Sequence, residues 1–169
     1  VFPCIVIFRI GVMTSRKISS YKAAVIQAGA FPNDTLASAR KAASLIEQAC
    51  RAGARLTVFP EAFLGGYPKG SSFGAPVGLR TQEGREAFRL YWDQAIDLDG
   101  PEVETIAAAT AATGVFAVIG CIEREHGTLY CTVLFFDGAN GLVGKHRKLM
   151  PTAGERLIWG FGDGSTMAP

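Results

Sequence analysis

The chain has 169 residues, of which 49% are hydrophobic and 19% charged, and its formal net charge is +2. This length and composition suit one globular domain with a sizeable core, and they argue against an intrinsically disordered chain. The near-neutral charge provides no overall field for nucleic acid or an anionic membrane surface, so we expect neither as a partner.

The cysteines are spread along the chain without a Cys-x-x-Cys pair, at Cys4, Cys50, Cys121 and Cys131. This spacing is typical of neither a zinc site nor a disulfide framework. Because unpaired cysteines are usual in a reducing compartment, we expect a cytoplasmic location.

The first residues read differently from the rest. Val1 to Gly11 is an apolar run without an initiating Met, a basic region or a small-residue cleavage site, and it is too short to span a bilayer. Met13, which polar residues follow, is a more natural start. We interpret residues 1–20 as a non-native or disordered leader and residues 21–169 as the folded domain.

The next stretch predicts a strand, a helix and a second strand. The strands are the apolar segments 21–27 and 56–59. Between them, Asp34 is a suitable N-cap and Gly53 a suitable C-terminal cap. Apolar residues recur between these caps at steps of three and four, at Leu36, Ala39, Ala43, Ile46 and Cys50. With a helix in the crossover, the two strands should be parallel neighbours.

Beyond residue 64 the pattern becomes mixed. A long loop rich in glycine and proline covers residues 65–82, and loops of this length tend to be functional. The pattern then predicts helices over 84–95 and 101–113, a buried strand over 115–122, and a hairpin of strands 128–136 and 142–148. The expected fold is therefore an α/β fold whose sheet has an antiparallel part.

Glu61 is the first candidate for chemistry. It follows an apolar strand and Pro60 directly, and thus lies at the carboxyl end of a buried strand, where open α/β sheets usually build their sites. Apolar Phe59 and Phe63 flank it, and desolvation of this kind raises a carboxyl pKa and favours a general base. A surface glutamate in a salt bridge explains the local pattern equally well.

Lys148 occupies an equivalent position at the end of the last predicted strand, within the basic run 145–148. Strand alternation places Lys145 and Arg147 on one face, and His146 and Lys148 on the other. An ammonium at this strand end could stabilise negative charge developing on a substrate, and Glu155 lies nearby in sequence as a second carboxylate. A solvated, charged strand edge is the alternative explanation.

Other chemical patterns are weak. The glycines of segment 160–165 invite a phosphate-loop reading, but no Gly-Lys-Ser/Thr is present, and a structural loop is favoured. His126 and His146 have no metal-site spacing, so we expect no metal centre. No serine lies in a nucleophile-elbow motif.

The two strand-end segments together resemble the nitrilase branch of the carbon–nitrogen hydrolase superfamily. Segment 59–70 (Phe-Pro-Glu-Ala-Phe-Leu-Gly-Gly-Tyr-Pro-Lys-Gly) is similar to the family's glutamate segment, and 145–152 (Lys-His-Arg-Lys-Leu-Met-Pro-Thr) to its lysine segment. Segments 155–160 and 162–165 resemble the stretch directly after that lysine segment in the family. The resemblance covers about residues 22–165. It implies an α-β-β-α sandwich, homo-oligomers built on a dimer, and no metal or organic cofactor.

The resemblance also implies roles for individual residues. A cysteine thiolate of the family attacks the carbon of a small-molecule nitrile, and the covalent intermediate yields ammonia and a carboxylic acid. Glu61 would take the thiol proton and later activate water. Lys148 would stabilise negative charge, and Glu155 would position the substrate and the lysine. Tyr67 and Pro68 would line the substrate pocket.

One departure matters. The family's nucleophilic cysteine comes after the Gly-Asp-Gly-Ser segment, at a point that residues 1–169 do not reach, so we assign no nucleophile. We expect a partial domain, roughly the first half of a nitrilase, inactive alone. The alternatives are an amidase or cyanide-converting relative, and a non-catalytic fragment that binds intact nitrilase subunits. A small nucleotide-binding α/β module is disfavoured because no phosphate loop is present.

Overall fold

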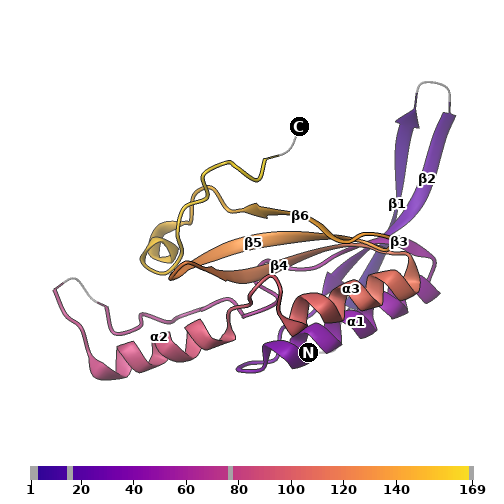
Figure 1. Cartoon of the computed structure of the whole chain (residues 1–169). Coiled ribbons are helices and arrows are strands. Elements are labelled where there is room, and N and C mark those ends of the chain that lie inside the picture. The colour runs from indigo at the N-terminus through magenta and orange to yellow at the C-terminus, as the bar shows by residue number, and fades with distance from the viewer. Residues whose placement is uncertain (1–3, 15–16, 76–77, 168–169) are drawn as a thin grey trace.

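The computed structural model describes residues 4–14, 17–75 and 78–167 (Figure 1). Its core is one six-stranded sheet in the order β1-β2-β3-β4-β5-β6. The strands are β1 Cys4–Thr14, β2 Lys17–Gln27, β3 Ala54–Val58, β4 Phe116–Glu125, β5 Thr128–Asp137 and β6 Gly141–Arg147. The helices are α1 Thr35–Arg51, α2 Gln82–Gln94, α3 Pro101–Thr113 and the short 3-10 helix Ala153–Leu157.

The strand–helix–strand prediction for the first part of the domain is confirmed. The Asp34 side chain accepts a hydrogen bond from the Ala37 N–H at 2.8 Å and thereby caps the first turn of α1. Gly53 has a φ of +83°, the left-handed conformation that ends a helix. The chain then enters β3, which pairs with β2 in parallel, as a crossover through a helix requires.

The antiparallel part of the sheet is also confirmed. α3 begins with Pro101 at its first turn and ends at left-handed Gly114, and β4 follows parallel to β3. β5 and β6 then return as antiparallel neighbours of β4 and β5. β6 therefore runs in the same direction as β3 and β4, so these three strands end at the same edge of the sheet.

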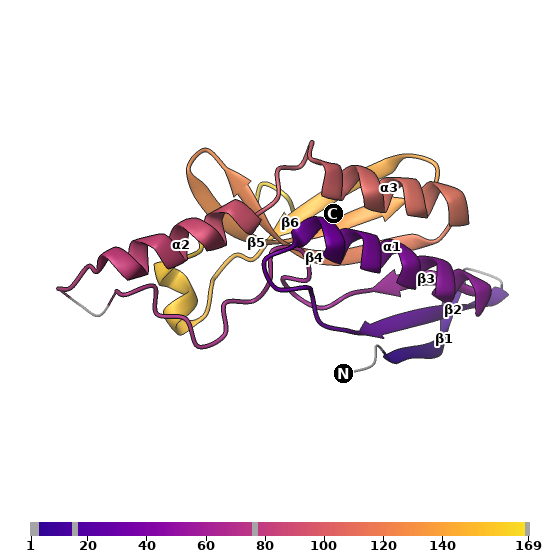
Figure 2. The ribbon, with the colours of Figure 1, turned by 90° about the horizontal axis from the view of Figure 1, so that it is seen from below.

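Helices α1 and α3 cover one face of the sheet, where they lie side by side (Figure 2). Directly opposed residues on that face form a row that is 0% exposed, made of Ala24, Thr57, Ala117 and Phe136. This row belongs to a larger apolar core between the sheet and the two helices, and its burial stabilises this part of the domain.

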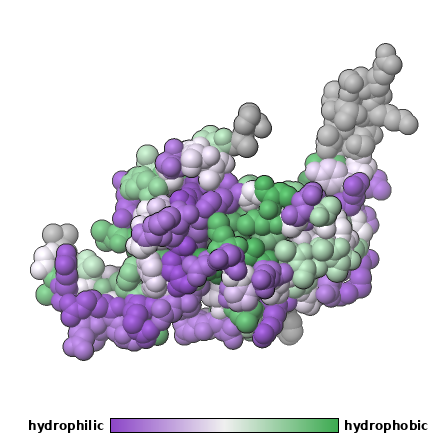
Figure 3. Space-filling model, in the orientation of Figure 1, coloured by the Kyte–Doolittle hydropathy of each residue, from purple (hydrophilic) through white to green (hydrophobic). Residues whose placement is uncertain are grey.

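The opposite face carries a second row of directly opposed residues across the same four strands. It is made of Val25, Val58, Val118 and Phe135. Val25 is 43% exposed, and Val58, Val118 and Phe135 are half-buried. Figure 3 shows apolar residues gathered near β4 to β6, next to the hydrophilic surface around α2. The described chain thus forms one sheet with one helical layer, and the apolar row on the other face has no covering layer within it.

One end of this second face is covered by the chain itself. The turn after β3, helix α2 and the 3-10 helix pack there around Trp159, which is 2% exposed, with Tyr91, Ile122 and Cys131. This second core supports the groups of the candidate site.

The beginning of the chain differs from the expectation. Over the described part of residues 1–20, Cys4–Thr14 is extended and pairs with β2 in an antiparallel register from Cys4↔Gln27 to Thr14↔Lys17. A disordered leader therefore does not describe these residues; a non-native origin, and the domain division at residue 21, stay predictions. Among the described residues, no helix has the length and hydropathy needed to cross a bilayer.

Candidate active site at two strand ends

A tight turn after β3 carries Glu61. The Phe59 N–H still donates to the Val118 carbonyl at 2.8 Å, and the chain then turns over β4, where the Leu64 N–H donates to the Gly120 carbonyl at 3.1 Å. A Cβ at Gly120 would lie 2.5 Å from the Pro60 carbonyl oxygen and 2.7 Å from Glu61 Cα. The absence of a side chain at Gly120 therefore lets this turn lie flat on β4, with Glu61 above the sheet.

Lys148 comes directly after β6 and is fixed by its backbone. Its N–H donates to the Cys131 carbonyl at 2.8 Å, and its own carbonyl accepts from the Gly162 N–H at 3.0 Å. Its ammonium Nζ lies 2.9 Å from Glu61 Oε1 and 2.9 Å from Glu155 Oε2. The structure thus brings the predicted acid and amine together, with the second carboxylate on the other side of the amine.

Glu155 is held by the 3-10 helix to which it belongs. Its Oε2 accepts the Thr152 N–H at 2.6 Å in a capping box, and its Oε1 accepts the Tyr67 hydroxyl at 2.8 Å. The side chain is 10% exposed. Both oxygens are therefore occupied, which suits Glu155 to orienting Lys148 rather than to accepting a proton.

The charges of this cluster support one another. Burial lowers the pKa of Lys148, but the hydrogen bonds to Glu155 and Glu61 outweigh it and hold the pKa above its ordinary value. Burial raises the pKa of Glu155, but hydrogen bonds from Thr152, Lys148 and Tyr67 bring it below the usual range. Lys148 is therefore a cation and Glu155 an anion at neutral pH.

Two aromatic residues without a predicted role, Trp159 and Tyr91, pack next to the cluster. Lys148 Nζ lies 5.6 Å from the centroid of the Trp159 ring, which packs edge-on against Tyr67 at 5.7 Å. Trp159 Nε1 donates to the Tyr91 hydroxyl at 3.0 Å. The sequence did contain a signal for Trp159, because this residue lies in segment 155–160, which resembles the family. No local pattern indicated a role for Tyr91.

The expected desolvation of Glu61 is wrong for this chain. Its side chain is 49% exposed, because neighbouring Phe59, Phe63 and Leu64 turn into the core beneath α1 and α3. The alternative explanation, a surface glutamate in a salt bridge, is confirmed, since Glu61 pairs with Lys148.

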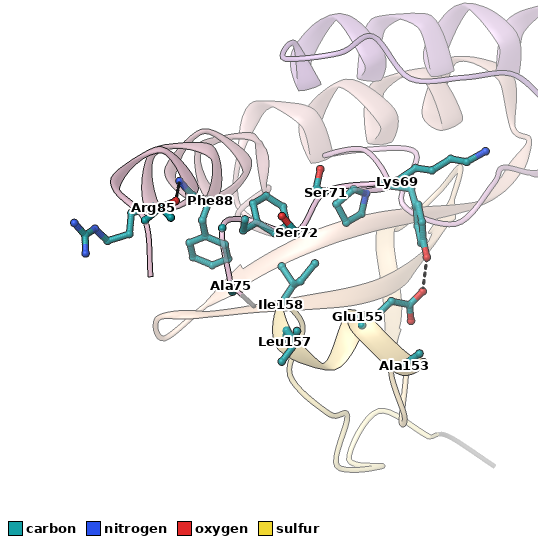
Figure 4. Close-up of a pocket in the computed structure, with 18 of the residues that line it drawn as sticks. Lys69, Ser71, Ser72, Ala75, Arg85, Phe88, Ala153, Glu155, Leu157 and Ile158 are labelled. Atoms are coloured by element: carbon teal, nitrogen blue, oxygen red, sulfur yellow. Dashed lines mark hydrogen bonds between the residues drawn. The ribbon is translucent and has the colours of Figure 1, made fainter. Parts of the chain in front are cut away.

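A hollow of about 1200 Å³ borders the cluster between loop 67–75, the start of α2 and the 3-10 helix. Tyr67 and Pro68, the two predicted pocket residues, line it together with Glu155. In Figure 4, Phe88 and Ile158 are directed into the hollow and Arg85 away from it. Phe88 and Ile158 thus give the hollow an apolar part, while Tyr67 and Glu155 form its polar border with the cluster.

The basic run at the end of β6 is divided between the two faces, as alternation predicted. Lys145 and Arg147 bind Glu123, whose side chain is 1% exposed, while Lys148 reaches Glu61. Thr132 also donates to Glu123, at 2.8 Å. The run is therefore not a solvated edge: one part neutralises a buried carboxylate and the other belongs to the cluster.

The cysteines occupy different environments. Cys4 is exposed, Cys50 half-buried, and Cys121 and Cys131 buried, as expected for small apolar core residues. Cys131 has a partner that the sequence analysis missed, because its Sγ lies 3.4 Å from Glu61 Oε1. Burial and the negative charge of Glu61 raise the pKa of its thiol to about 12. Within the described residues, no group of acidic, histidine and cysteine side chains is arranged to hold a metal ion.

Comparisons with known proteins identify the family of the chain. A family model described as carbon–nitrogen hydrolase matches residues 22–169. A nitrilase from Bradyrhizobium diazoefficiens is 78% identical over 155 residues, which are 92% of this chain and 48% of the relative. A bifunctional nitrilase/nitrile hydratase from Nicotiana tabacum is 56% identical over 146 residues, 86% of this chain and 42% of the relative. The chain spans about half the length of these relatives.

Solved structures show the same fold. A CN-hydrolase superfamily protein from Xanthomonas campestris aligns with a TM-score of 0.62 at 20% identity, over 84% of this chain and 46% of that one. An amidase from Nesterenkonia sp. aligns with a TM-score of 0.59 at 19% identity, over 83% and 48%. The α/β fold is therefore that of the carbon–nitrogen hydrolases, over about half of their length. The chain belongs to the carbon–nitrogen hydrolase family and resembles its nitrilase branch in sequence.

Proposed function

We propose that Glu61, Lys148 and Glu155 form the base and lysine side of a nitrilase active site, which converts a nitrile into a carboxylic acid and ammonia. The observation that carries the proposal is the position of Lys148 Nζ, 2.9 Å from a carboxylate oxygen on each side. Two carboxylates that hold one ammonium next to an open hollow match the chemistry that the family requires. The nucleophilic cysteine would come from a segment outside residues 1–169.

Each residue of the cluster has a role in the proposed hydrolysis. Glu61 accepts the proton of the attacking thiol, and the sulfur forms a bond to the nitrile carbon as the proton passes to the nitrogen, which gives a thioimidate. Lys148 donates a hydrogen bond where negative charge develops. Water then adds to the thioimidate and ammonia leaves, which gives a thioester. A second water, activated by Glu61, releases the acid and restores the thiol. Glu155 and Tyr67 keep Lys148 in place.

We further propose that residues 1–169 alone hydrolyse no nitrile. Cys131 is the cysteine nearest the cluster, but it is buried and its pKa of about 12 keeps the thiol protonated at neutral pH. In the intact protein we propose a small-molecule nitrile as substrate and a homo-oligomer as the assembled form.

The test combines this chain with the part of a full-length relative that the chain does not cover. Residues 1–169 are mixed with, or fused to, the remaining half of the Bradyrhizobium nitrilase, and ammonia release from phenylacetonitrile and benzonitrile is measured. The expected result is turnover by the mixture or the fusion and none by either part alone. A fusion that is folded yet inactive on every nitrile and amide tested would refute the proposed activity. Turnover by residues 1–169 alone would refute the proposed inactivity.

One alternative is tested in the same assay, and a second one needs a binding experiment as well. An amidase or cyanide-converting enzyme uses the same three groups, so acetamide and cyanide are included, and a preference for either would replace the nitrile. A non-catalytic fragment that binds nitrilase subunits is supported by the apolar row of Val25, Val58, Val118 and Phe135, which no layer of the described chain covers. Retention of a full-length relative on immobilised residues 1–169, together with an inactive fusion, would favour that role.

A further inference from the structure

Cys131 connects the two strand ends of the candidate site. It lies on β5, the strand next to β6, and its side chain is on the sheet face that carries Glu61 and Trp159. Its thiol contacts Glu61 Oε1 at 3.4 Å, and its backbone carbonyl accepts the Lys148 N–H at 2.8 Å. One residue thus contacts the proposed base through its side chain and the proposed lysine through its backbone.

We propose that Cys131 is a positioning residue, whose thiol fixes the carboxylate of Glu61 relative to Lys148; the proposal rests on the function proposed above. Oε1 takes both the Cys131 thiol and the Lys148 ammonium. Among the residues that the structure describes, Oε2 takes no hydrogen bond. Two donors on one oxygen restrain the carboxylate and leave Oε2 as the oxygen that can accept the proton of a nucleophile.

The surroundings of Cys131 suit this role better than a reactive one. The residue is 6% exposed and packs with Ala62, Ile122 and Trp159 in the second core, so solvent has little access to the sulfur. A protonated thiol is a donor, and burial together with the charge of Glu61 keeps the proton on sulfur. By contrast, Cys121 is buried on the helix-covered face, where Glu123 rather than Glu61 is the nearby carboxylate that raises its pKa.

The first test uses residues 1–169 and needs no turnover. Peptide mass spectrometry measures the rate at which iodoacetamide alkylates each cysteine across a range of pH. The proteins compared are the wild type, Glu61→Gln and the control Glu47→Gln, on the exposed face of α1. Removal of the Glu61 charge should lower the Cys131 pKa and speed its alkylation about tenfold per pKa unit. Cys121 should react equally in all three proteins. An unchanged Cys131 rate in folded Glu61→Gln would overturn the proposal.

The second test uses the active fusion and separates positioning from packing. Cys131→Ala should lower kcat with little change in KM, while Cys131→Ser, which keeps a donor, should recover most of the activity at an unfolding midpoint similar to that of the alanine variant. Equal activity of the two variants would overturn the positioning role. A nitrile-derived mass on Cys131 would instead identify it as a nucleophile. If the fusion turns over no nitrile, the alkylation test still decides whether the Cys131 thiol interacts with the Glu61 carboxylate.

Discussion

Lys148 Nζ lies 2.9 Å from Glu61 Oε1, although 87 residues separate the two in sequence. The contact results from strand direction. β3 precedes Glu61, β6 precedes Lys148, and both strands run parallel to β4, so their carboxyl ends lie at the same edge of the sheet. The two turns fold over the same face above Ile122 and Cys131. Sheet topology therefore places the acid beside the amine, and the side chains complete the pair.

The turn that holds Glu61 depends on the bare backbone of Gly120. Gly120→Ala places a Cβ 2.5 Å from the Pro60 carbonyl oxygen, so the turn must lift away from β4. We expect a loss of about 1–3 kcal/mol in the free energy of unfolding, the usual cost of overpacking. Urea unfolding measures it. Gly29→Ala is the control, because a Cβ at Gly29 meets no atom within 4 Å; equal stability of the two variants would show that Gly120 is not required.

The buried carboxylate of Glu123 stabilises the β4–β6 meander. Glu123→Gln removes the buried anion, 1% exposed, that Lys145 and Arg147 share, and leaves them only the more exposed Glu125. We expect a loss of about 1.5–3 kcal/mol, the usual scale for hydrogen bonds to a charged group, because Glu125 still pairs with both cations. Glu47→Gln, whose partner Arg51 is on the exposed surface of α1, should cost less than about 1 kcal/mol. Similar unfolding midpoints for both variants would contradict this role.

The same carboxylate makes the domain sensitive to acid. Burial raises the pKa of Glu123, but hydrogen bonds from Arg147, Lys145 and Thr132 bring it below its ordinary value of 4.5. Because the folded-state pKa is the lower one, the stabilisation is fully present above about pH 4.5 and is lost as pH falls through the folded-state value. Asp97 shifts in the same direction, through its hydrogen bond from Arg124.

The unfolding free energy of the wild type should therefore fall between about pH 7 and about pH 3. In Glu123→Gln the fall should be smaller, since one titrating group is absent, whereas Glu47→Gln should match the wild type. Urea titrations at the two pH values make the comparison. An equal fall in all three proteins would exclude Glu123 as a source of the acid sensitivity.

The sequence predicted the features that depend on near neighbours. Asp34 and Gly53 delimit α1 through local caps, and strand alternation separated Arg147 from Lys148. The pairing of Glu61 with Lys148 was expected because strand ends gather at one edge, and because the segments resembled a family. The buried face of α1 was predicted in part. Ala39 and Ile46 are buried as expected, and the other predicted members are half-buried, with Ala43 and Cys50 packed against the core. The helix also buries residues that were not predicted, namely Ser38, Ala42, Leu45 and Ala49.

The features that the sequence did not predict depend on long-range packing. The exposure of Glu61 depends on where Phe59 and Phe63 turn, and apolar neighbours in sequence do not specify that direction. The contact between Cys131 and Glu61 joins residues 70 apart through the register of β4 and β5. The pairing of β1 with β2 is likewise set by a free sheet edge, which composition does not reveal.

The most direct measurement compares ammonia release by the fusion with that of its Glu61→Gln and Lys148→Ala variants, once circular dichroism shows that all are folded. Each variant should lose at least about 10²-fold in kcat, the scale on which a general base or a charge-stabilising donor acts. Glu47→Gln and Lys41→Ala, both on α1, should retain the activity of the parent fusion. Nitrile turnover that survives loss of either the Glu61 carboxylate or the Lys148 ammonium would contradict the account.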